Sequence, residues 1–184
     1  MAAAGRVHDR TILDALEGRK AEALDATVWR VVRHGRDPLQ AALAGGRWNA
    51  TGEFDVLYTS LAREGALAEV GYRLSLEPVW PSRIAHDIHA LKARAERALR
   101  IDTLDRLAAL GVNVARYESF DYAATQAIAA ASHFLEFDAL IVPSARYEGA
   151  NVVLFPERLR RAPKVTKTER VDWGRWRKKA RGGK

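Results

Sequence analysis

The chain has 184 residues, of which 48% are hydrophobic and 29% are charged. The length predicts one domain that buries a core without disulfides or a structural metal. Because there is no cysteine, the sequence excludes a disulfide framework, a thiol nucleophile and every cysteine-based zinc or iron–sulfur site. No apolar run approaches the roughly 18 residues of a membrane span, and residues 1–6 carry no apolar signal segment. We therefore expect a cytoplasmic protein without a membrane partner.

The positive charge is concentrated at the C-terminal end. Residues 157–184 hold 12 Lys and Arg against 3 Asp and Glu, a balance of +9, which leaves −2 for the rest of a chain whose net charge is +7. The high isoelectric point therefore belongs to this end of the chain. The nearly neutral remainder has no evident basic face of the kind that binds nucleic acid.

This charge distribution and the order of the predicted elements divide the chain into three segments. An N-terminal helical segment covers residues 1–26, a central domain covers 27–157, and a basic tail covers 158–184. The tail is expected either to form a disordered arm or to dock on the domain through Trp173 and Trp176.

The first half of the chain predicts an alternation of helices and strands. Apolar residues at helical spacing predict a short helix within residues 1–20, and the β-branched run 27–32 predicts a strand. A short buried strand is expected at 56–59. Ser60 is expected to cap the helix 61–76, in which apolar residues recur at i, i+3, i+4 and i+7.

The second half predicts further strands and helices without a regular alternation. Residues 83–89 are weakly strand-like, and periodicity leaves 90–101 open between strand and helix. The remaining expected elements are a capped helix from 102 or 103 to 110, an alanine-rich helix at 122–134, and strands at 137–142 and 151–155. This mixture favours a single α+β domain.

The loop Gly45-Gly46-Arg47-Trp48-Asn49 is the most unusual cluster in the sequence. An arginine beside a tryptophan in a flexible loop offers a planar fork for an anion and an aromatic face for a ring. The alternative is an arginine in water beside a tryptophan that fills the core. Spacing alone leaves both interpretations open.

Glu69 lies in the middle of the predicted helix 61–76, roughly opposite its apolar stripe. Its carboxylate is therefore expected either in solvent, paired with Arg73 one turn later, or in a cleft against another element. Arg30 lies within a predicted strand between apolar neighbours, where a charge needs a partner or an anion unless that face is solvated.

Other candidates are equally open when they are taken singly. Tyr58 ends a short strand, and is either half-buried or free to stack on a planar ring. Ser144 follows a buried strand, where it is either a turn serine or part of a site. His86 and His89 have no third ligand residue beside them, so no metal site is expected.

Taken in order, these signals form a specific pattern. They are Trp29-Arg30-Val-Val32, Gly46-Arg-Trp-Asn49 with Gly52, Leu57-Tyr58-Thr-Ser60, Ala66-Leu-Ala-Glu69, Val142-Pro-Ser144 and Asn151-Val-Val-Leu154. From about Trp29 to Pro156 the chain closely resembles the RES-domain family, the toxin half of bacterial toxin–antitoxin pairs with Xre-type antitoxins. The sequence departs from the family at Ala50-Thr51, where Pro-Lys is frequent, and in its basic tail.

The resemblance implies an α+β fold like that of ADP-ribosyltransferase toxins, with a central cleft that binds NAD as substrate and uses no metal. It implies catalytic roles for Glu69, Tyr58 and Arg30, and substrate-binding roles for Arg47, Ser144 and Asn151. A carboxylate at Glu69 would stabilise the positive charge that develops on ribose as nicotinamide leaves.

Several properties stay open at this level. The resemblance implies a cognate Xre-type antitoxin, through which any contact with nucleic acid is indirect. The acceptor of ADP-ribose is water, phosphate or a cellular protein. The alternative function is a non-catalytic module that uses the basic tail to engage nucleic acid or a partner protein.

Overall fold

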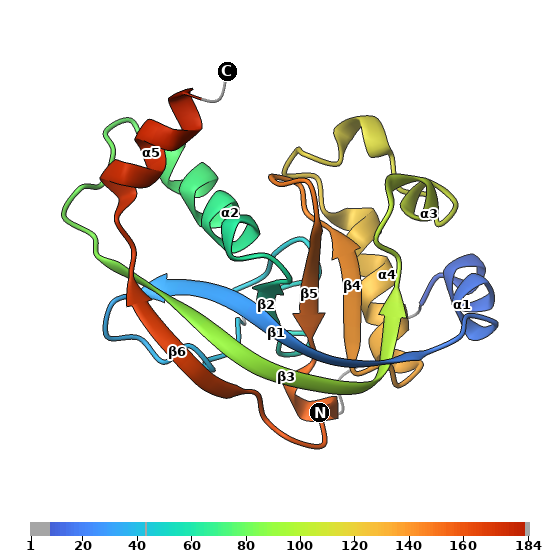
Figure 1. Ribbon diagram of the computed structural model, residues 1–184. Coiled ribbons are helices and arrows are strands. Elements are labelled where there is room, and N and C mark those ends of the chain that lie inside the picture. The colour runs from blue at the N-terminus through green and yellow to red at the C-terminus, as the bar shows by residue number, and fades with distance from the viewer. Residues whose placement is uncertain (1–7, 43, 183–184) are drawn as a thin grey trace.

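The computed structural model describes residues 8–42 and 44–182 of the chain. It contains one six-stranded mixed sheet and five α-helices within that part of the sequence (Figure 1). The strands are β1 (Glu22–Arg33), β2 (Leu57–Ser60), β3 (His86–Arg100), β4 (Ala139–Pro143), β5 (Ala150–Leu154) and β6 (Lys164–Arg170). The helices are α1 (Arg10–Glu17), α2 (Arg63–Ser75), α3 (Leu104–Ala108), α4 (Ala123–Phe134) and α5 (Trp173–Gly182), with short 3₁₀ turns at Val114–Arg116 and Pro156–Arg158.

The strands run in the order β1-β2-β5-β4-β3-β6, and β1 also pairs with β3. Long antiparallel ladders join β1 to β3 and β3 to β6, while β2, β5 and β4 form a second antiparallel group. The two groups meet at narrow points, the pair Trp29–Ser60 and the short parallel pairing of residues 98–100 with 139–141. The sheet is therefore open between β1 and β2, where β1 diverges from its neighbour.

The segment 90–101, which periodicity left open, is part of strand β3. Residues 86–91 are buried on both faces of the strand, and burial alternates only from 92 to 96. Its conformation is determined by pairing with the distant strand β1, from Glu22–Ala98 to Arg33–His86. A local sequence pattern cannot contain that information.

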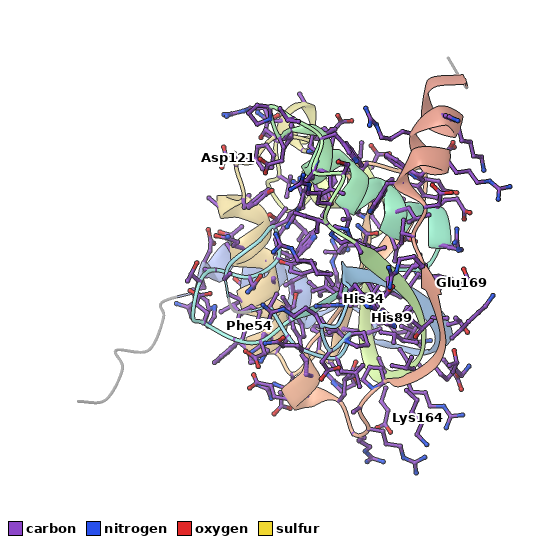
Figure 2. All side chains as sticks on the ribbon, turned by 90° about the vertical axis from the view of Figure 1, so that its left-hand side faces the viewer. His34, Phe54, His89, Asp121, Lys164 and Glu169 are labelled. Carbon is purple, nitrogen blue, oxygen red and sulfur yellow. The ribbon has the colours of Figure 1, made fainter. Side chains whose placement is uncertain are left out.

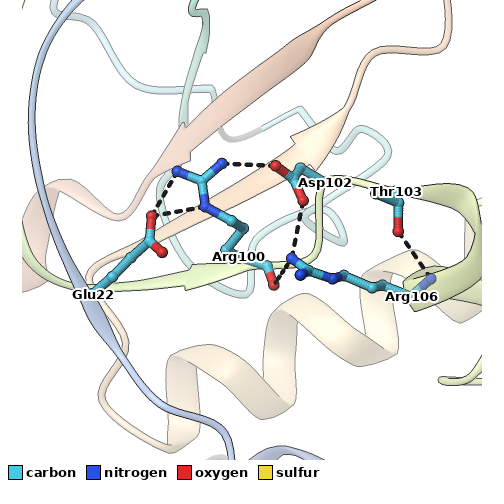
Figure 3. Close-up of polar contacts among 5 residues, drawn as sticks. All are labelled: Glu22, Arg100, Asp102, Thr103 and Arg106. Carbon is cyan, nitrogen blue, oxygen red and sulfur yellow. Dashed lines mark hydrogen bonds and ion pairs between the residues drawn. The ribbon is translucent and has the colours of Figure 1, made fainter.

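A polar network fastens the C-terminal end of β3 (Figure 3). The guanidinium of Arg100 donates to Glu22 at 2.9 Å and to Asp102 at 2.7 Å, and Asp102 accepts a second bond, from Arg106, at 3.1 Å. The two carboxylates raise the pKa of Arg100 above its ordinary value. Of the two residues expected to cap α3, Thr103 is the one that does so, by accepting from the amide of Arg106. The start of β1, the end of β3 and the start of α3 are thereby held together.

The larger core lies between the β4–β5 pair and helix α4, with α1 at its margin (Figure 1). The alanine-rich helix predicted at 122–134 is confirmed as α4, and its small residues allow the helix to approach the strands closely. Buried side chains from both layers meet here, and they include Ile128, Leu140, Val142, Val153 and Phe155. Burial of this apolar surface is the main stabilising contribution to this half of the domain.

Helix α2 begins two residues later than predicted, and the expectation that Ser60 caps it is wrong. The N-cap residue is Ala62, which makes no side-chain capping bond. Ser60 instead ends β2, where it pairs with Asn151 of β5, and its hydroxyl reaches the amide of Ala62 only at 3.4 Å. Pairing between strands therefore places Ser60 in β2, although the local sequence predicted it as the N-cap of the helix.

The C-terminal segment is folded onto the domain. Strand β6 adds to the outer edge of β3, and Figure 2 shows Lys164 and Glu169 along this exposed strand. Trp173 is buried in a second core with Leu67 and Ile88, and Trp176 packs against the same cluster. Of the two expectations for the tail, docking through the two tryptophans is the one observed. None of the helices in the described part of the chain has the length and apolar character needed to cross a membrane.

Candidate active site

A cavity of about 260 Å³ lies beside the opening between β1 and β2, under helix α2. Strands β1, β2 and β5, helix α2 and the loops near residues 47, 122 and 145 all contribute to its wall. The polar and aromatic side chains that line it include Trp29, Arg30, Arg47, Tyr58, Glu69, Tyr72, Arg73, Phe120, Tyr122, Arg146 and Asn151. Five of the six site residues predicted from the sequence therefore line one cavity. The sixth, Ser144, lies just outside this lining.

Glu69 lies in this cavity. Its Oε1 accepts a hydrogen bond from the hydroxyl of Ser144 at 2.6 Å and another from Nδ2 of Asn151 at 2.8 Å. The apolar stripe of α2 faces the second core, which turns Glu69 toward the strands. The sequence left the Glu69 carboxylate either in solvent or in a cleft, and in the structure it lies in the cleft.

Ser144 and Asn151 are brought together by the antiparallel pairing of β4 with β5. Val142 pairs with Asn151, so the residues that follow β4 lie beside the start of β5. Ser144 lines a neighbouring depression of about 440 Å³. Its hydroxyl donates a hydrogen bond to Glu69, which lines the main cavity. Oδ1 of Asn151 is buried and has no hydrogen-bond partner among the described residues.

Arg30 is a half-buried cation that bridges two backbone segments. Its guanidinium donates to the carbonyls of Tyr58 at 3.3 Å and Gln40 at 2.8 Å, while Nε is buried without a partner among the described residues. Burial lowers the pKa of Arg30 to about 10, so it still carries its charge at neutral pH. A half-buried cation that bonds only to neutral carbonyls attracts an anion.

Arg47 is held by the segment that follows the first 3₁₀ turn. Its guanidinium donates to the carbonyls of Tyr117 and, at 3.3 Å, Ser119. The same group lies over two aromatic rings, 4.6 Å from the ring centroid of Tyr117 and 4.8 Å from that of Tyr122. Arg47 is therefore an ordered part of the cavity wall, which excludes the interpretation of a loop arginine in water.

The residues on either side of Arg47 are held in place by contacts with Tyr58. The Tyr58 hydroxyl donates to Oδ1 of Asn49 at 2.7 Å and accepts from the amide of Trp48 at 2.9 Å. A Cβ at Gly46 would lie 2.7 Å from this hydroxyl, so the position requires glycine. Trp48 is only 3% exposed and fills the core. Burial raises the pKa of Tyr58 to about 12, so the hydroxyl keeps its proton at neutral pH.

The sequence reasoning missed part of the wall. Arg146 lies with its guanidinium carbon 3.5 Å from the ring centroid of Tyr72 and donates to the carbonyl of Glu118 at 2.5 Å. Arg73 also lines the cavity, although the sequence assigned it only as an ion-pair partner of Glu69. The one available signal for Arg146 was its place two residues after Ser144.

The cavity is therefore predominantly positive. Four arginines line it against the single carboxylate of Glu69, and exposed Phe120 and half-buried Tyr122 add aromatic faces. Guanidinium forks suit phosphate oxygens and aromatic faces suit planar rings. The arrangement can hold an anionic ligand that carries rings and place one part of it against a carboxylate.

His86 and His89 lie on opposite faces of β3, because their spacing is odd. His86 accepts from the indole of Trp173 at 3.1 Å, and His89 is hydrogen-bonded to Thr168 at 2.8 Å. Within residues 8–42 and 44–182, no group of three or more His, Cys, Asp or Glu side chains is gathered to hold a metal ion.

Comparison with known proteins identifies the family and the fold. The RES domain family matches residues 27–174, whereas no curated protein sequence matches the chain. A solved structure with the same fold is that of the toxin MbcT in the M. tuberculosis MbcT–MbcA toxin–antitoxin complex, with a TM-score of 0.81 and 19% identity over 92% of this chain and 97% of that one. The prediction of a single α+β domain is thus confirmed, and its fold is the one seen in that complex. The match over most of its length places this chain in the RES-domain family.

Proposed function

We propose that this chain is the toxin of a toxin–antitoxin pair and cleaves the bond between nicotinamide and ribose in NAD. The observation that carries the proposal is the position of Glu69, whose carboxylate is held by Ser144 and Asn151 inside a cavity lined by arginines. Membership of the RES-domain family and the fold shared with MbcT support the same assignment.

The chemistry requires a fixed negative charge beside the ribose. Departure of nicotinamide builds positive charge on the ribose, and a preorganised carboxylate stabilises that charge as it forms. Both hydrogen bonds to Glu69 go to Oε1, which leaves Oε2 to face the sugar. Nicotinamide leaves as a neutral molecule, so the reaction needs no strong acid. The raised pKa of Tyr58, about 12, suits a group that orients the loop and the ring without exchanging a proton.

The remaining wall residues bind the rest of the dinucleotide. Arg30 and Arg47 hold the diphosphate by charge-assisted bonds from their guanidinium groups, both of which line the cavity. Asn151, which also lines the cavity, helps to hold Glu69 through its Nδ2. The cavity, at about 260 Å³, is slightly smaller than the roughly 300 Å³ at which ligand pockets usually begin. We therefore place the nicotinamide and its ribose inside and the adenosine along the rim.

A toxin of this kind requires a cognate antitoxin, which we propose to be of the Xre type. The similar toxin MbcT is found in a complex with MbcA. An antitoxin that covers the cavity would block access of NAD to Glu69. The alternative of a non-catalytic module that binds through an aromatic and basic tail has less support, because Trp173 is buried on the domain and is not available to a partner.

The experiment that tests the proposal also identifies the acceptor. Purified protein is incubated with NAD labelled in its adenine ring, in buffer alone, with inorganic phosphate, or with antitoxin-free cell lysate, and the products are separated by chromatography. Release in buffer alone identifies hydrolysis, a requirement for phosphate identifies phosphorolysis, and label on protein identifies ADP-ribosyl transfer. Nicotinamide release in none of the three arms would exclude the enzymatic function.

A further inference from the structure

The face of α2 that points away from the cavity is covered by the C-terminal segment, the part of the chain formed by β6 and α5 (Figure 1). We propose that this segment positions α2, and that Gly71 and Trp176 are positioning residues for Glu69. The inference rests on the proposed function, because it assigns a catalytic consequence to the contact. It gives the basic tail a role in the site rather than in binding a separate partner.

The contact between Gly71 and Trp176 leaves no space for a side chain. A Cβ at Gly71 would lie 2.3 Å from Cη2 of the Trp176 ring and within 2.8 Å of two further ring atoms. The helix backbone therefore lies directly against the indole. Any side chain at this position must push the helix and the indole apart.

The indole cannot move away easily, because other rings hold it. Trp176 and Trp173 are in edge contact with centroids 5.4 Å apart, and Trp173 meets Trp80 in the same way at 6.0 Å. The guanidinium of Arg177 lies 4.5 Å from the ring centroid of Trp80. Trp173 in turn donates to Nδ1 of the buried His86 at 3.1 Å. The ring of Trp176 is thus one member of a connected aromatic cluster that is anchored on β3.

The C-terminal segment also holds the start of α2. Arg63, the first residue of the helix, forms an ion pair with Glu169 of β6 at 3.0 Å. The helix needs such support, because its N-cap Ala62 makes no side-chain capping bond. The two contacts together fix the helix near its first turn and near Gly71, two residues beyond Glu69.

The consequence for the site follows from helix geometry. Two residues along a helix are separated by about 200° around its axis, so Gly71 and Glu69 lie on nearly opposite sides. A shift of α2 away from Trp176 therefore changes the position of Glu69 relative to Ser144, in the turn after β4, and to Asn151 of β5, which do not move with the helix. Misplacement of a catalytic group by about 1 Å can lower the rate roughly 100-fold.

Substrate binding is expected to change less than the rate. Arg30 and Arg47, which we assign to the diphosphate, lie outside α2 on β1 and on the loop before β2. Displacement of α2 leaves them in place. The predicted signature of the positioning role is therefore a fall in kcat with little change in KM.

The test is a double-mutant cycle between Gly71→Ala and Trp176→Ala, with nicotinamide release as the readout. Gly71→Ala is expected to lower kcat at least 10-fold with KM within 3-fold, because its Cβ collides with the indole. In the Trp176→Ala background the same change is expected to alter kcat by less than 2-fold. Gly18→Ala is the matched control, since a Cβ there meets nothing within 4 Å, and it should keep the wild-type kcat.

Additive effects of the two substitutions, or a wild-type kcat for Gly71→Ala, would overturn the inference. Amide hydrogen exchange of α2 in the same four proteins separates this result from failure of the proposed function. If the wild type releases no nicotinamide, the proposed function fails. The positioning of α2 is then judged by exchange alone, where faster exchange in Gly71→Ala that is absent from the Trp176→Ala background supports it and uncoupled exchange contradicts it.

Discussion

Ser144 donates a hydrogen bond of 2.6 Å to Oε1 of Glu69, although 75 residues separate them in the sequence. The bond joins α2, which the C-terminal segment covers, to the turn that follows β4. With the second bond from Asn151, it fixes the carboxylate at the boundary between the two groups of strands. The position of Glu69 therefore depends on how these two parts of the domain are packed together.

Replacement of Ser144 by alanine removes one of the two bonds that hold Glu69. A hydrogen bond to a charged group contributes about 1.5–3 kcal/mol, so we expect kcat for nicotinamide release to fall about 10- to 100-fold. Ser82→Ala, at an exposed serine in the loop after α2, should keep wild-type kcat. A Ser144→Ala enzyme with kcat within 2-fold of wild type would show that Asn151 alone is sufficient.

Arg47→Lys keeps the charge but removes the planar fork that bonds the carbonyls of Tyr117 and Ser119 and stacks on aromatic rings. We expect KM for NAD to rise about 10-fold, with a loss of about 1–2 kcal/mol in the free energy of unfolding. Arg116→Lys is the control, because the side chain of Arg116 forms an exposed ion pair with Asp121 away from the cavity lining. An unchanged KM would remove Arg47 from the binding site and leave it a structural role.

Tyr58→Phe leaves Oδ1 of Asn49 and the amide of Trp48 without their shared partner. We expect a loss of about 1–3 kcal/mol in the free energy of unfolding, measured by urea denaturation at pH 7.5. The more exposed Tyr147→Phe should leave stability unchanged. Equal stability of Tyr58→Phe and wild type would contradict the role of the hydroxyl in holding the loop.

The same tyrosine affects stability at high pH. Its pKa is about 12 in the folded protein against an ordinary value of 10, so between these values the unfolded chain loses the proton first. Stability therefore falls as pH rises from about 10 toward 12. The Tyr58→Phe variant should show a shallower decline between pH 9 and 11, and an identical slope would contradict the assigned shift.

His86 links stability at low pH to the docking of α5. Burial lowers the pKa of His86 below 6.5, and its Nδ1 must stay unprotonated to accept from Trp173. Below about pH 6.5 the unfolded chain binds the proton first, so stability declines as pH falls. One such histidine contributes at most about 1.4 kcal/mol per pH unit.

His86→Gln keeps an acceptor at this position without a proton to gain. We expect its free energy of unfolding to fall less than that of wild type between pH 7.5 and 5.5, as measured by urea denaturation. Burial also lowers the pKa values of His89 and His133, so part of the decline remains. A variant with the same decline as wild type would show that His86 does not sense this pH range.

Local signals in the sequence predicted most of the elements, and long-range pairing accounts for the differences. The alanine-rich helix α4 and the strands β4 and β5 follow from periodicity and turn residues. Ser60 carried a valid cap signal, yet pairing with Asn151 placed it in β2. The segment 90–101 became a strand because β1 lies beside it. Neither outcome is visible in a local window.

The site was predictable as a set of residues but not as a set of contacts. The family pattern identified Arg30, Glu69 and Asn151, and these residues line one cavity. It did not reveal that Ser144 donates a hydrogen bond to Glu69. Nor did it reveal that Arg47 donates to backbone carbonyls of a segment distant in the sequence. These contacts depend on how separate elements are packed, which the spacing of residues along the chain does not record.

The most direct test of the account is nicotinamide release from NAD by the wild type and by Glu69→Gln, measured by chromatography. Glutamine keeps the shape and removes the negative charge, so kcat should fall at least 100-fold, with thermal stability close to that of wild type. Glu64→Gln, at an exposed glutamate on the same helix, should release nicotinamide at the wild-type rate. Equal release by wild type and Glu69→Gln would contradict the assignment of this carboxylate and of the cavity around it.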